Sequence, residues 1–216
     1  MIELHYSPGN ASTTPHILLH EIGAPFELRL VDRARNANKS PEYLKLNPNG
    51  VIPTLVDGEL VLFETAAICL HLLDTHPQAG LIPPLGTRER AHFYKWLVWM
   101  SASVQSMMVP HYFYPDRMVD PGNLAGAAEV KARAAAWIDA KLDLLDAQFA
   151  SHGGPWVMGE RYSGLDPYAF MLCRWTRGFA RPARSLPHLG PFLARMLERA
   201  AVRRVAADEN WAQPLV

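Results

Sequence analysis

The order of strand and helix patterns in the first 75 residues constrains the fold of this 216-residue chain more than any other feature. Residues 2–6 alternate as a short strand and run into a Ser-Pro-Gly-Asn turn. Residues 13–22 carry apolar side chains at helical spacing, and Gly23 closes the segment. Residues 26–31 again alternate with period two, so the chain begins with a βαβ unit whose strands are expected to be parallel.

A hairpin is predicted after a short helix at residues 41–46. Two apolar runs, residues 51–56 and 59–63, are joined by Asp-Gly, and these two residues tolerate the positive φ of a type I′ turn. Residues 65–73 return to helical spacing with one apolar face. The order β-α-β-α-β-β-α predicts a mixed sheet with helices on both faces.

The pattern changes near residue 77. Residues 78–86 have the composition of a linker, with two prolines and two glycines. Beyond it, Pro110 is expected to stop the first of several helices. We place these helices at about 87–109, 124–150, 163–179 and 191–207. We therefore predict an α/β domain at 1–77 and an all-α domain at 87–216.

The charge balance limits the class of partner. Lys plus Arg and Asp plus Glu number 21 each, so the formal net charge is zero. We expect neither nucleic acid nor an anionic membrane surface as partner, because both are recognised by excess positive charge. No apolar run approaches the ~20 residues of a membrane span, and the opening MIELHYSPGN lacks the basic and apolar regions of a signal peptide. The expected location is the cytoplasm.

Metal and disulfide chemistry find little support in the sequence. Cys69 and Cys173 lie far apart in apolar helical patterns and are expected to be reduced core residues. His16 and His20 have i, i+4 spacing, but no carboxylate or cysteine cluster accompanies them in the sequence. We therefore predict no metal site.

Two short segments have the chemistry of a peptide-binding site. Pro53 begins an apolar strand and has no N–H to donate to a neighbouring strand. A cis Ile52-Pro53 bond would leave the backbone N–H and C=O of Ile52 free to pair with an extended peptide. The alternative is an ordinary edge-strand proline. Glu64 and Thr65 lie where the hairpin ends and a helix begins, so free N–H groups can receive a carboxylate while Glu64 accepts from an ammonium group. The alternative is a helix cap of structural value only.

Together with the turn at residues 7–12, these segments resemble the glutathione transferase superfamily over nearly the whole chain. Residues 44–55 (LKLNPNGVIPTL) and 62–72 (LFETAAICLHL) are similar to that family's N-terminal signature. Ser163-Gly-Leu-Asp166 matches the capping box that the family places on a helix of its second domain, and residues 187–205 are similar to its C-terminal helix. The resemblance is nearest to the bacterial beta class.

The resemblance implies a thioredoxin-like N-terminal domain with a glutathione site, followed by the all-α domain. Ile52 would pair with the cysteinyl backbone, and Glu64 and Thr65 would hold the γ-glutamyl end. Lys39 would meet the glycyl carboxylate, although the basic residue that many members carry before the Val-Pro-type dipeptide is Val51 here. The family also implies a homodimer, with glutathione as co-substrate and no further cofactor.

The group that activates the thiol departs from the family's main patterns. Ala11 occupies the position of the beta-class cysteine, and Gln105 that of its helical histidine. Asn10 holds the place of the hydroxyl in serine-type members, and Ser12 keeps a hydroxyl at the start of the first helix, where the dipole favours a thiolate. We predict that Ser12 or Asn10 is the catalytic group. Helix capping is the alternative for Ser12, and Tyr6 or backbone donors remain open.

The predicted reaction transfers glutathione to an apolar electrophile that is held beside a stabilised thiolate. Met107, His111 and Tyr112 are candidates for the pocket of this second substrate, and core packing or a dimer surface explains them as well. Alternatives are a glutathione-dependent reductase, dehalogenase or lyase, and a non-catalytic binder of glutathione or a hydrophobic ligand. A cysteine-based deglutathionylase is disfavoured, because the turn contains no thiol.

Overall fold

The computed structural model describes residues 1–216. The chain has two compact units, of which the first joins Met1–Pro84 with Arg195–Leu215 and the second comprises Leu85–Ala194 and Val216. Residues 195–215 therefore pack with the first unit although they are distant from it in sequence. The division into domains at 1–77 and 87–216 stays a prediction.

The first unit contains a four-stranded sheet in the order β2-β1-β3-β4. β1 and β2 are parallel and the other two pairs are antiparallel, so the predicted mixed sheet is confirmed. The strands are β1 Ile2–Tyr6, β2 Phe26–Leu30, β3 Thr54–Asp57 and β4 Leu60–Phe63. The helices of this unit are α1 Thr13–Ile22, α2 Pro41–Leu46, α3 Thr65–Thr75 and α8 Ala200–Asp208.

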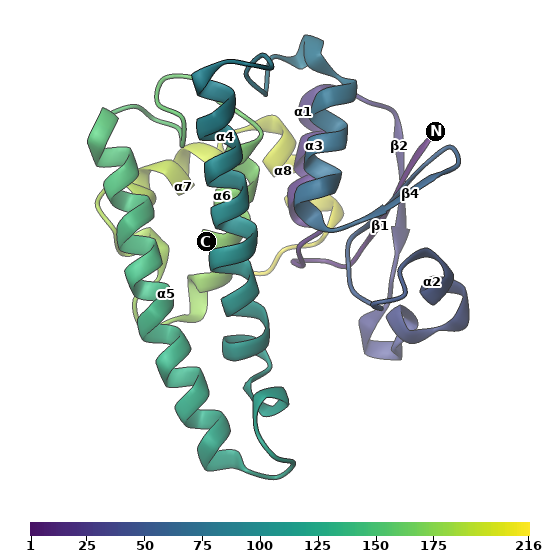
Figure 1. The fold of residues 1–216 in the computed structure, drawn as a ribbon, viewed down its shortest axis with the longest axis vertical. Helices are drawn as coiled ribbons and strands as arrows, with labels where there is room; N and C mark the ends of the chain where they lie inside the picture. Colours follow the sequence, from purple (N-terminus) through teal and green to yellow (C-terminus); the bar gives the residue numbers. More distant parts are fainter. The chain divides into compact units, whose positions relative to one another are not determined.

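Helices α1 and α3 lie side by side and pack against the sheet, and α8 packs on α1 (Figure 1). Apolar side chains at helical spacing on α1 and α3 meet those of the two central strands, which forms the core of the unit. Fully buried members of this core are Leu4, Ile17, Leu18, Leu19, Leu55, Ile68, Leu72 and Leu73. The predicted fold class of the first unit is therefore confirmed.

The hairpin turn differs from the prediction. Asp57 pairs with Leu60, so the two loop residues are Gly58 and Glu59. Gly58 has φ 62°, and Glu59 is not among the residues with positive φ. A type I′ turn needs positive φ at both central residues, whereas a type II′ turn needs it at the first alone and favours glycine there. The type I′ prediction was wrong, because the register places Asp57 in the strand.

The second unit is helical, and its only β-type pairing is an isolated bridge between Trp156 and Gly159. The helices begin with α4 Arg88–Val98, followed by the π-helical segments η4 Trp99–Gln105 and η5 Met108–Phe113. They continue with α5 Leu124–His152, α6 Leu165–Trp175 and α7 Leu189–Leu197, whose last turn belongs to the first unit. No helix is both long and apolar enough to cross a membrane.

Two predicted helix boundaries were wrong. Pro110 lies inside η5 and does not stop the helical path, because the wider π-helical turn accommodates a residue that has no N–H. The helix expected at 191–207 is divided into α7 and α8. Arg199 is extended between them, with φ −71° and ψ 135°, and its guanidinium forms two hydrogen bonds of 2.6 and 2.7 Å with Glu21 of α1.

The capping box at the start of α6 is confirmed. The carboxylate of Asp166 accepts from the Ser163 N–H at 2.7 Å, and the Ser163 hydroxyl accepts from the Leu165 N–H at 3.3 Å. Asp166 also accepts from the Val157 N–H at 2.9 Å. Because Asp166 is fully buried, it joins the segment before α6 to the helix as well as capping it.

Candidate functional site

The sheet register brings three separate segments to one end of the sheet. His5 near the end of β1 lies opposite Thr54 at the start of β3, and Thr54 lies opposite Phe63 at the end of β4. The chain therefore leaves β1, enters β3 and leaves β4 at the same end. These three strand ends adjoin the segments of the predicted site, which are the first-turn loop after β1, the Ile52-Pro53 dipeptide before β3 and the Glu64-Thr65 pair after β4.

The first-turn loop is closed by hydrogen bonds of its own. Asn10 N–H donates to the Ser7 carbonyl at 3.1 Å across Pro8 and Gly9, and Gly9 has the φ of 68° that the third position of a type II turn requires. Ser12 is fully buried, and its hydroxyl accepts from the Ser7 N–H at 3.2 Å and donates to the Ser7 carbonyl at 3.1 Å. The one hydroxyl proton of Ser12 is thus committed to the loop.

Asn10 is the other predicted thiol-activating residue. Its side-chain Oδ1 accepts from the Ala11 N–H at 2.7 Å, and this bond fixes the amide so that its NH₂ group remains to donate elsewhere. The side chain is half-buried at the start of the loop that leads into α1. Asn10 therefore has an oriented and uncommitted donor, which Ser12 lacks.

Tyr6 faces a different environment. Its ring lies 6.0 Å from that of His16 on α1. Burial raises the pKa of the Tyr6 phenol, and the negative charges of Glu209 and Asp208 raise it further. The phenol is therefore held neutral near the carboxylates of the C-terminal segment.

The Ile52-Pro53 peptide bond is cis, as predicted. The preceding carbonyl, that of Val51, accepts from the Tyr43 hydroxyl at 2.7 Å and from the Asn47 side-chain amide at 2.9 Å. The Ile52 side chain packs in a small buried cluster with Val31 and Tyr43. The β1–β3 ladder ends at Thr54, so the Ile52 backbone lies outside it. Two side chains of the α2 region thus position this dipeptide.

Glu64 carries the least favourable backbone conformation near the site. It is the residue before α3, with φ 73° and ψ 113°, and it is one of three non-glycine residues with positive φ. Such a conformation costs about 1–3 kcal/mol and is concentrated at ligand-binding positions. The Glu64 side chain is exposed, while Thr65 begins the helix and is buried. The N-terminus of α3 is therefore held open beside an uncommitted carboxylate.

Lys39 ends the short 3-10 helix Ala37–Lys39 that precedes α2, and it is exposed. Its ammonium donates to the Asn49 carbonyl at 3.3 Å, and a Cβ on Gly50 would lie 2.6 Å from its Nζ. Gly50 has φ 60°, and a Cβ there would also lie 2.8 Å from the Asn38 carbonyl oxygen, so both its conformation and this backbone contact require glycine. The ammonium keeps further protons for an acceptor.

Comparison with known proteins identifies the family. A family model described as the glutathione S-transferase N-terminal domain matches residues 4–74. A glutathione S-transferase of Xanthomonas campestris pv. campestris is 32% identical over 211 residues, which cover 97% of this chain and 99% of that protein. The chain belongs to the glutathione S-transferase family. The predicted family and class of enzyme are thereby confirmed.

Solved structures of this family agree with the fold of the transferase. A glutathione transferase homologue from Sulfitobacter, with bound glutathione, superposes with a TM-score of 0.86 at 27% identity and covers 96% of this chain and 98% of its own. The beta-class glutathione S-transferase of Sphingomonas chungbukensis has a TM-score of 0.80 at 28% identity, and the match covers 99% of this chain and 100% of that one. The predicted similarity to bacterial glutathione transferases is confirmed.

Glu209, which sequence reasoning missed, organises the base of the first-turn loop. Its buried carboxylate accepts from the Gly9 N–H at 2.8 Å, the Thr13 hydroxyl at 3.1 Å and the Trp211 indole at 2.8 Å, and it lies 3.0 Å from Nδ1 of His16. Glu209 comes from the far end of the chain, 200 residues after Gly9. No local pattern marks an acidic residue at a helix end as a partner of a distant loop.

The residues predicted to contact the second substrate all lie at η5 in the second unit. Met107, His111 and Tyr112 are half-buried, and Nδ1 of His111 is buried without a hydrogen-bond partner. The Tyr112 ring stacks on Phe179 at a centroid distance of 3.8 Å, and Nζ of Lys131 lies 4.9 Å from its centroid. Their contact with a substrate stays a prediction.

Both cysteines are free and buried, as predicted. Burial raises the pKa of the Cys69 thiol, and it raises the pKa of Cys173 to about 12. A thiol with such a pKa is almost entirely protonated at neutral pH and is a poor nucleophile. Neither sulfur has the properties of a catalytic cysteine.

Proposed function

We propose that this transferase binds glutathione at the end of its sheet and conjugates the sulfur to an apolar electrophile. The observation that carries the proposal is the unfavourable conformation of Glu64 at the open N-terminus of α3, beside the Ile52-Pro53 dipeptide. An α-amino acid terminus satisfies both groups, since its carboxylate meets the helix N-terminus and its ammonium meets Glu64. The glutathione-bound Sulfitobacter homologue supports the choice of ligand.

The remaining contacts follow the shape of the tripeptide. We assign the cysteinyl backbone to the free N–H and C=O of Ile52, which act as one more strand position. Lys39, with its ammonium near Gly50, is the proposed partner of the glycyl carboxylate. Family membership also supports a homodimer and a location in the cytoplasm. Light scattering would measure the oligomeric state.

Asn10 is the proposed donor to the glutathione sulfur, and Ser12 the residue that holds the loop in shape. A thiol with its free pKa of about 8.5 is mostly protonated at pH 7, so a donor to the thiolate increases the reactive fraction. The Asn10 amide has an uncommitted NH₂ group, whereas the Ser12 proton is donated to the Ser7 carbonyl.

Thr65→Ala is expected to weaken glutathione binding by about 1–3 kcal/mol, because a hydrogen bond to the ligand's charged carboxylate is lost. Titration calorimetry measures this change. Thr75→Ala is the matched control, since Thr75 ends the same helix and its hydroxyl donates to the His71 carbonyl. Equal affinity of the Thr65→Ala and native proteins would remove Thr65 from the site.

Asn10→Ala is expected to raise the apparent pKa of the bound thiol by about 1–2 units, because a donor to the thiolate is worth about 1.5–3 kcal/mol. The rate profile for conjugation of a generic aromatic electrophile should therefore move to higher pH. Ser12→Ala should lower the stability of the protein and leave this pKa in place. The opposite result, with Ser12 alone moving the profile, would transfer the role to Ser12.

A substrate screen separates the proposed conjugation from related chemistry. Reduction, dehalogenation and ether cleavage each release a product that conjugation does not. If the protein binds glutathione but turns over no electrophile, the result would support the alternative of a non-catalytic glutathione-binding protein.

A further inference from the structure

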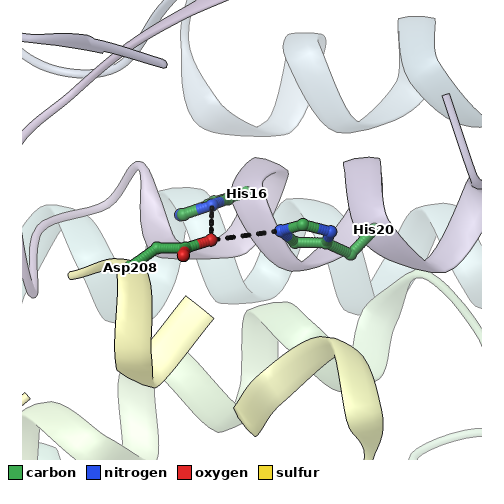
Figure 2. Close-up of side chains that lie close together, drawn as sticks. All are labelled: His16, His20 and Asp208. Atoms are coloured by element: carbon green, nitrogen blue, oxygen red, sulfur yellow. Dashed lines mark ion pairs between the residues drawn. The ribbon is translucent and has the colours of Figure 1, made fainter. Parts of the chain in front are cut away.

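We propose that His16, His20 and Asp208 form a binding site for a divalent transition-metal ion of the Zn²⁺ type. The two histidines lie one turn apart on α1, and Asp208 is the last residue of α8 in the same unit. Figure 2 shows both imidazoles turned toward the carboxylate of Asp208. Glu21, the carboxylate next to His20 in the sequence, pairs with Arg199, and the fold supplies Asp208 from almost 190 residues away.

The distances suit one ion. Nε2 of His16 lies 3.8 Å and Nε2 of His20 3.6 Å from Oδ2 of Asp208, and the three ligand atoms lie within 4.8 Å of one another. Ligands at 2.0–2.2 Å around a tetrahedral Zn²⁺ are about 3.4 Å apart, so modest side-chain rotations close the site. Two imidazoles and a carboxylate are a ligand set that Zn²⁺ accepts, with a fourth position left for water.

Both ligating nitrogens lack another partner. Nε2 of His16 and Nε2 of His20 are buried and form no hydrogen bond, and the His16 side chain is wholly buried. Buried polar atoms are normally satisfied, so two such atoms that converge on one carboxylate need an explanation.

Glu209 contacts the ring nitrogen of His16 that does not face the proposed ion. Its Oε1 lies 3.0 Å from Nδ1 of His16, and its other oxygen is held by the Gly9 N–H and the Trp211 indole. A proton on Nδ1 directed at Glu209 places the lone pair of His16 on Nε2, which faces the other two ligands. Metal-bound histidines commonly have such a carboxylate on the second nitrogen.

The surroundings allow an ion to enter. The side chains of His20 and Asp208 are 24% and 28% exposed, so the site lies next to solvent although the two ligating nitrogens are themselves buried. The edge-on Phe26 ring packs against both imidazoles, with centroid distances of 5.7 and 5.0 Å. Arg204 competes for the carboxylate with a contact of 3.3 Å, but its side chain is 69% exposed and is free to swing away.

Calorimetric titration of the full chain with Zn²⁺, after treatment with a chelator, tests the site. The native protein should bind one ion per chain, and the Tm should rise with Zn²⁺ concentration. His20→Asn and Asp208→Asn should each weaken binding by at least about 100-fold, since loss of an outer-shell partner alone costs roughly 10–100-fold. These partly exposed residues are chosen over the fully buried His16 so that the variants fold.

His71→Asn is the matched control, because it removes another His–carboxylate pair, with Asp57 at 2.9 Å, that has no third ligand. It should bind Zn²⁺ as the native protein does. Co²⁺ provides a second readout, since a four-coordinate site gives strong visible absorption bands that His20→Asn should abolish. Absence of stoichiometric Zn²⁺ binding, or unchanged binding in both ligand variants, overturns the proposal. Neither result depends on glutathione.

Discussion

Glu209→Ala is expected to lower the free energy of unfolding by about 3–5 kcal/mol, the largest effect that the structure predicts for the first unit. The variant removes the acceptor of the Gly9 N–H, the Thr13 hydroxyl and the Trp211 indole, and it leaves Nδ1 of the buried His16 without its carboxylate. Each buried donor that loses its partner costs about 1–3 kcal/mol, and relaxation of the loop recovers part of the sum.

Urea denaturation measures this loss, and amide exchange at Gly9 shows whether the loop has opened. Glu198→Ala is the control, because Glu198 is an exposed carboxylate in the same C-terminal segment. Its replacement should change stability by less than about 0.5 kcal/mol. A loss below 1 kcal/mol in Glu209→Ala, with Gly9 still protected, would show that Glu209 does not hold the loop.

Asp166→Ala is expected to cost about 2–5 kcal/mol, because the buried Val157 and Ser163 N–H groups both lose their acceptor. The first of these anchors the segment before α6, and the second caps the helix itself. The effect should therefore exceed that of an ordinary N-cap replacement, which is about 1 kcal/mol.

Thermal and urea unfolding of Asp166→Ala, beside the exposed Asp116→Ala as control, measure the difference. Asp166→Asn retains one acceptor oxygen and should fall between the native protein and the alanine variant. Native stability in Asp166→Ala would mean that solvent or other donors replace the box in solution.

Features that depend on neighbouring residues could be predicted from the sequence. The order of strands and helices along the chain follows from alternation and turn residues. The cis bond at Pro53 follows from a proline that begins an apolar strand, and the capping box follows from Ser163 and Asp166 three positions apart. Each of these signals is contained within a few residues, so local chemistry decides it.

Features that depend on long-range contacts could not be predicted. The proposed metal site is one of these, because Asp208 reaches His16 and His20 only after α8 packs on α1. The commitment of the Ser12 hydroxyl depends on where the loop places Ser7. The type of the hairpin turn depends on which residues of the two strands pair. A shift of the pairing by one residue changes the turn, and the sequence indicates the pairing only through its pattern of apolar residues.

Titration calorimetry of the native protein with glutathione at neutral pH is the decisive test of the proposed glutathione site. We expect saturable binding of one glutathione per chain, together with an apparent pKa of the bound thiol below its free value of about 8.5. A protein that unfolds cooperatively in the same buffer, and is therefore folded, yet binds no glutathione would contradict it.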